Sequence, residues 1–96
     1  MIEDCFGGLV IQYGDHMKCH SNRTVSLQGY QGHSYWGHED KNSGQVSVFH
    51  DNNCQHVAYS IAIPRNECIT VPMLVRGLLY DKICNCWDVD LNCGKS

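Results

Sequence analysis

Histidine and glutamate side chains cluster in one short segment of the chain, and they are the residue types best suited to acid–base chemistry. His33, His38 and Glu39 follow one another closely. A ribonuclease pairs an acid with a base, often His with Glu, and needs a cation to stabilise the developing charge, which Arg65 or Arg76 could supply. Because a chain with six histidines forms such groups by chance, a small secreted ribonuclease-like hydrolase is the alternative function rather than the main prediction.

Aromatic residues spaced by glycines occupy the same segment, residues 28–38. Tyr and Trp provide a large contact area at a small loss of side-chain entropy, so such a segment is typical of a recognition surface. The candidate partner-binding residues are Tyr30, His33, Tyr35, Trp36 and His38. The competing interpretation places Tyr35 and Trp36 in the core and the glycines in turns.

Cysteine is unusually frequent, with seven in 96 residues. The candidates for disulfide bonds are Cys5, Cys19, Cys54, Cys68, Cys84, Cys86 and Cys93. A small chain with this density is typical of proteins that mature in an oxidising compartment, so we expect a secreted, extracellular protein. Seven is odd, and one thiol must therefore be free, bound to another molecule, or joined to a second copy in a disulfide-linked dimer.

Spacing restricts the pairing of these cysteines without fixing it. Cys84 and Cys86 flank one residue of an expected strand, so their side chains share a face and each should bond a different partner. Cys54 and Cys68 bracket the clearest strand and could close a hairpin-sized loop. We expect the unpaired thiol among the three C-terminal cysteines, with Cys93 as the first choice.

A metal site is not expected. His16, Cys19 and His20 lie within five residues, and zinc binds both residue types, but the chain has no Cys-x-x-Cys pair. Cys19 is better explained as a disulfide partner, with the two histidines exposed in a loop. No cofactor motif is present elsewhere, and no cofactor is predicted.

Charge and hydropathy argue against nucleic-acid binding and against a membrane span. The formal net charge is −3 and the cations are scattered, which disfavours nucleic-acid binding. No apolar run approaches the about 20 residues that span a bilayer. Asn22 begins an Asn-Arg-Thr sequence, a candidate N-glycosylation site that agrees with secretion.

The alternation of apolar and polar residues predicts a mainly β fold. We expect one disulfide-rich domain over residues 1–96, built as a small antiparallel β-sandwich or Greek-key domain. The alternative is an α+β fold with a short helix near residues 73–80. The expected strands are residues 9–13, 23–30, 45–50, 56–63, 68–71, 74–80 and 83–89.

Residues 46–59 resemble the opening of a βγ-crystallin Greek-key motif. Phe49 takes the place of the aromatic that ends the first strand, and Cys54 that of the buried residue before the second. His56 stands where that family has a glycine, and the calcium-binding residues are missing, so the resemblance implies a fold without a calcium site. In its cysteine-rich texture the chain also resembles small secreted fungal effectors and killer-toxin-like proteins, which implies binding to a host or competitor target.

These observations predict a secreted binding protein without catalytic activity, an effector or toxin-like virulence protein that contacts a protein or cell-surface target in another organism. A second alternative is a protease inhibitor. In that case the loop over residues 63–68 would present Arg65, with Pro64 and Cys68 restricting its motion.

Overall fold

The computed structural model describes residues 2–3, 9–12, 18–21, 23–39, 43–65 and 67–86. Within these ranges the chain forms eleven strands. They are β1 (Ile2–Glu3), β2 (Leu9–Gln12), β3 (Val25–Leu27), β4 (Tyr30–Gly32), β5 (Ser34–Glu39), β6 (Ser43–Phe49), β7 (Val57–Pro64), β8 (Cys68–Ile69), β9 (Met73–Val75), β10 (Leu78–Tyr80) and β11 (Ile83–Cys86). No described segment forms a helix long and apolar enough to cross a membrane.

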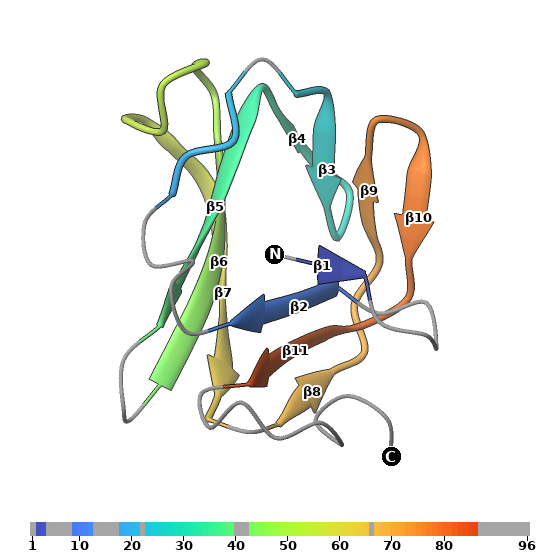
Figure 1. The fold of residues 1–96 in the computed structure, drawn as a ribbon. Helices are drawn as coiled ribbons and strands as arrows, with labels where there is room; N and C mark the ends of the chain where they lie inside the picture. Colours follow the sequence, from blue (N-terminus) through green and yellow to red (C-terminus); the bar gives the residue numbers. More distant parts are fainter. Residues whose placement is uncertain are drawn as a thin grey trace.

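The strands form three sheets that surround a common core (Figure 1). One sheet has the order β5-β6-β7, another the order β10-β9-β3-β4, and the third the order β1-β2-β11-β8. All described pairs are antiparallel except β2 with β11, which join distant parts of the chain in parallel. The predicted mainly β, antiparallel, disulfide-bonded fold is therefore confirmed, with one parallel pair that the sequence did not indicate.

The three-stranded sheet shows how alternation positions side chains. Val46 and Val48 of β6 are fully buried and face the other sheets, as expected for every second residue of a strand. A register shift between Val48 and Phe49 pairs Tyr59 with Val48 and Val57 with Phe49. Val57 is consequently 57% exposed, although the sequence pattern placed it on the apolar side of the strand.

Residues 73–80 form a hairpin, which corrects the alternative of a short helix there. β9 and β10 are joined by Arg76 and Gly77, whose φ angles are 51° and 82°. Two consecutive residues with positive φ define the two-residue turn whose twist suits a hairpin. The same geometry recurs at Gln28 (φ 50°) and Gly29 (φ 89°), between β3 and β4.

The buried core is shared by the three sheets. Side chains from each sheet contribute to one apolar cluster: Leu9, Val25, Leu27, Tyr35, Val46, Val48, Ile63, Val71, Met73, Val75, Tyr80 and Ile83. At about 25 cal/mol for each Å² of apolar surface buried, this cluster is the main favourable contribution to folding.

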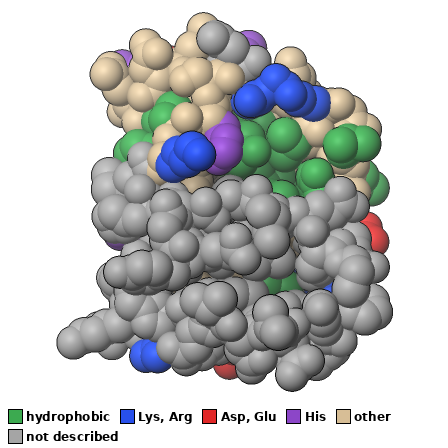
Figure 2. All heavy atoms as spheres, viewed as in Figure 1, with side chains coloured by type: hydrophobic (Ala, Val, Ile, Leu, Met, Phe, Trp, Pro, Cys, Tyr) green, Lys and Arg blue, Asp and Glu red, His purple; other side chains and the backbone are tan. Residues whose placement is uncertain are grey.

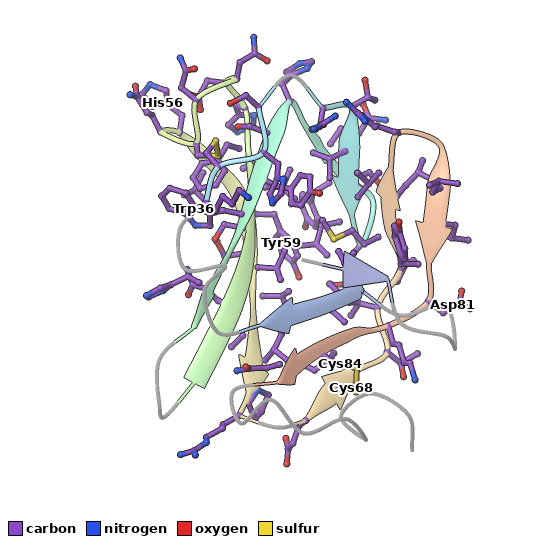
Figure 3. All side chains as sticks on the ribbon, viewed as in Figure 1. Trp36, His56, Tyr59, Cys68, Asp81 and Cys84 are labelled. Atoms are coloured by element: carbon purple, nitrogen blue, oxygen red, sulfur yellow. A yellow bond between two sulfur atoms is a disulfide. The ribbon has the colours of Figure 1, made fainter. Side chains whose placement is uncertain are left out.

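Among the described residues, two disulfides link segments that are distant in sequence. Cys19 bonds Cys54, which ties the segment before β3 to the loop after β6. Cys68 bonds Cys84, which links β8 to β11 within one sheet, as Figure 3 shows. The hairpin-sized Cys54–Cys68 pairing is therefore wrong, because each of these residues has a different partner.

The remaining cysteine predictions are only partly covered by the described residues. Cys84 is paired, which removes it from the three candidates for the unpaired thiol. Cys5 and Cys93 lie outside the described residues, and so does the side chain of Cys86. Asn22, the candidate glycosylation site, and His16 also lie outside them.

Candidate partner-binding surface

The five predicted contact residues are distributed over different sides of the molecule. Tyr35 points into the core, is 7% exposed, and stacks on His20 with ring centroids 4.6 Å apart. This burial contradicts the prediction that Tyr35 contacts a partner and supports the competing interpretation for this residue. His20 is half-buried by the same stacking and corrects the expectation of an exposed loop histidine.

Trp36 and His38 lie on the outer side of β5, because alternate residues of a strand share a face. The Trp36 ring meets Phe49 edge to face, with centroids 4.8 Å apart and an interplanar angle of 74°. Figure 3 shows Trp36 directed away from the centre of the molecule and Tyr59 toward it. Both Trp36 and His38 are half-buried, so only part of each is available to a partner.

The outer side of this sheet also carries a polar row. The Gln45 side-chain amide donates to the Ser47 hydroxyl at 3.3 Å, and the Ser47 and Ser60 hydroxyls are hydrogen-bonded at 2.7 Å. The three side chains thus hydrogen-bond one another, and the row by itself does not indicate a ligand.

Tyr30 differs from the candidates Tyr35, Trp36 and His38, because 53% of its surface is exposed. Its ring lies parallel to that of Tyr59, with centroids 4.2 Å apart and an interplanar angle of 8°. The Tyr59 hydroxyl donates a 2.8 Å hydrogen bond to Oε1 of Gln28. We call Tyr30 and Tyr59 the tyrosine pair. The Tyr30 ring is exposed to solvent on one side, and the Tyr59 ring that supports it is held by the hydrogen bond to Gln28.

Local sequence explains this arrangement. The Gln28-Gly29 turn sets Tyr30 opposite Leu27, on the side of β4 that faces the three-stranded sheet. The register shift in β6 and β7 places Tyr59 opposite Val48, on the same inner side. The β3–β4 hairpin and β7, which are distant in sequence, thus bring together the rings of Tyr30 and Tyr59 and the side-chain amide of Gln28.

The structure separates the proposed acid–base residues. His33 is exposed just before β5, and His38 lies five positions later along that extended strand. At about 3.3 Å per residue the two histidines are roughly 16 Å apart, too far to act on one phosphate. The Glu39 side chain lies outside the described residues. Among the described side chains no group of three or more potential metal ligands is found.

The loop that could present Arg65 to a protease is a tight turn. The Glu67 amide donates to the Pro64 carbonyl at 3.1 Å, and Arg65 lies exposed within this turn. A peptide that adds to an enzyme as a strand needs an extended backbone. The turn geometry therefore does not favour the inhibitor alternative.

The loop between β6 and β7 contains the residues of the Greek-key resemblance. Phe49 and Cys54 are both buried, and Cys54 has a φ of 57°. The Asp51 carboxylate accepts hydrogen bonds from the amides of Asn53, Gln55 and His56. Desolvation raises the pKa of Asp51, but these hydrogen bonds outweigh it and lower the pKa below the ordinary value of 3.8. The carboxylate thus holds the loop in place.

The chain matches no protein-family model, no curated protein and no solved structure. Function must therefore be inferred from the surface itself. Sequence reasoning found Tyr30 but missed Tyr59 and Gln28, because nothing in a local pattern indicates that positions 31 residues apart form a hydrogen bond.

Proposed function

We propose that the protein is a secreted binding protein without catalytic activity, which engages a target through the tyrosine pair. The cysteine-rich texture supports an effector-like or toxin-like role, and we propose a protein or cell-surface component of another organism as the target. The observation that carries the proposal is the exposed Tyr30 ring, held parallel to Tyr59.

Preorganisation is the physical reason. Binding energy concentrates in a few aromatic anchors, and an anchor fixed before binding loses little entropy on binding. Stacking on Tyr59 limits the motion of the Tyr30 ring, while the Tyr59 hydroxyl bond to Gln28 keeps the supporting ring in place.

The surroundings of the pair suggest the chemistry of the target. The exposed neighbours in the chain are Gln28, Gly29 and Gln31, all uncharged. A contact here would combine ring stacking with amide hydrogen bonds.

The test combines a binding assay with an activity assay on the oxidised protein. Labelled protein is incubated with intact cells of candidate target organisms, and unlabelled protein with total RNA. We expect saturable binding that weakens when Tyr30 is replaced by alanine, and intact RNA. Cleavage of the RNA that disappears in His33→Ala or His38→Ala would contradict the proposal and establish the hydrolase alternative.

A further inference from the structure

Exposed leucines are concentrated on the β9–β10 hairpin. Leu74, Leu78 and Leu79 are 38%, 59% and 62% exposed, and they are the only leucines among the exposed large hydrophobic residues of the described part of the chain. Figure 2 shows hydrophobic side chains on the margin of the molecule where Figure 1 draws this hairpin. Exposed apolar side chains gathered on one element indicate a contact site more than single scattered ones do.

The leucines lie on both faces of the sheet. Leu79 pairs with Leu74, and Leu78 pairs with the buried-side residue Val75. Successive side chains of a strand point to opposite faces, so Leu78 and Leu79 are directed oppositely. A partner that covered one face would leave the other leucine exposed, whereas a strand added at the edge would cover both.

The backbone of β10 is ready for such an addition. β10 is the edge strand of its sheet, next to β9 alone. In a hairpin with a two-residue turn, the flanking residues Val75 and Leu78 exchange both of their backbone hydrogen bonds. The next pair, Leu74 and Leu79, does not, so the N–H and C=O of Leu79 point toward the open edge.

We propose that β10 pairs with β10 of a second copy of this chain, antiparallel and centred on Leu79. The two-fold axis then lies between the two Leu79 residues, which exchange two backbone hydrogen bonds. Leu79 and Leu74 of both copies form one continuous apolar row on the outer face. On the other face, Leu78 of each copy lies against Tyr80 of the other.

Charge favours a second copy over another extended peptide. The exposed residues Arg76 and Asp81 lie beyond opposite ends of β10 and carry opposite charges. Antiparallel pairing brings the end of each β10, which the exposed Asp81 follows, beside the start of the other, which Arg76 precedes. The next cation, Lys82, is half-buried, and its carbonyl accepts from the Leu9 amide of β2, so the chain has left β10 at that point. Attraction between Arg76 of one copy and Asp81 of the other, repeated by the two-fold symmetry, thus accompanies the leucine contacts.

Sedimentation velocity of the oxidised full chain, from micromolar to millimolar concentration, tests the proposal. A contact of three residues on each side is small, so we expect a weak, reversible dimer. Leu79→Lys should abolish it, because it places a charge in the apolar row. Val57→Lys, at an equally exposed apolar position on β7, should leave it intact.

Charge reversal gives a second measurement that does not depend on hydrophobicity. Arg76→Asp and Asp81→Arg should each weaken the dimer at least about tenfold, and the double variant should restore it. Hydrogen exchange should show the Leu79 amide becoming protected as concentration rises. Any of three results would overturn the proposal. The protein could be monomeric at every concentration, the dimer could persist in Leu79→Lys, or intact mass measurement without reductant could show that the dimer is covalent.

Discussion

Gly32 lies where β4 passes close to β6, and the backbone there leaves no room for a side chain. A Cβ atom at this position would collide with Cγ1 of Val48 and with the backbone carbonyl oxygen of Phe49. The carbonyl cannot move without disturbing β6, which is the centre of its sheet. This glycine is thus required by packing, since its φ is not positive.

Gly32→Ala should therefore lower the free energy of unfolding by about 1–3 kcal/mol, the usual cost of overpacking. Urea denaturation followed by circular dichroism measures the change. Gly29→Asn is the control, because position 29 has open space and Asn tolerates a positive φ. If both variants were equally stable, the close approach of β4 to β6 would be wrong.

The Asp51 carboxylate should make stability depend on acid pH. Its folded-state pKa is lowered, so its contribution is fully present above the unfolded value of about 3.8 and disappears as pH falls through the folded pKa. We expect Asp51→Ala to melt at a lower temperature than the wild type at neutral pH. The difference in melting temperature should shrink on acidification below pH 3.8, and a difference that stayed constant would contradict this role.

At the scale of the elements, alternation predicted the strands that carry branched apolar residues. The predicted strands at 45–50 and 56–63 correspond to β6 and β7. β5 was missed because its buried side bears Tyr35 and Gly37, while Trp36 and His38 point outward. A glycine facing the core and a tryptophan facing outward give the opposite of the usual apolar pattern.

Turn chemistry explains two of the four strands that the structure adds to the seven predicted ones within the described residues, namely β4 and β10. The segment 74–80 was expected to be one strand, or a helix, but Arg76-Gly77 breaks it into β9 and β10. Asn-Gly and Asp-Gly are the usual sequence signals for this turn, whereas this chain has Arg-Gly and Gln-Gly at the two turns. The tyrosine pair could not be predicted from sequence, because it depends on how two sheets pack.

Replacing Gly77 by valine should weaken the β9–β10 hairpin. A branched residue at a φ of 82° is strained, and we expect a loss of about 1–2 kcal/mol. Arg76→Asn is the matched control at the neighbouring turn position, since Asn adopts positive φ readily. Thermal melts at low protein concentration compare the two; a Gly77→Val variant as stable as the control would exclude the turn geometry described.

At the scale of the whole molecule, the two disulfides among the described residues add covalent links between segments that are distant in sequence. They close loops of 35 and 16 residues. In the loop-entropy model these bonds contribute about 4 and about 3 kcal/mol, comparable with the net stability of a small domain. The oxidised state is therefore expected to be necessary for folding.

Dithiothreitol should accordingly lower the melting temperature and reduce the β signal in circular dichroism. The paired substitutions Cys19→Ser with Cys54→Ser should destabilise at least as much as Cys68→Ser with Cys84→Ser, because the loop is longer. Reduction without any effect on the melting temperature would refute the covalent framework.

The central claim is that this oxidised framework presents Tyr30 to a target. The most direct measurement is the dissociation constant for the same target cells, compared between Tyr30→Ala and Val57→Ala. Both positions are more than half exposed, but only Tyr30 belongs to the tyrosine pair. We predict at least about a tenfold weakening for Tyr30→Ala and no change for Val57→Ala. Equal dissociation constants for the two variants would contradict the account.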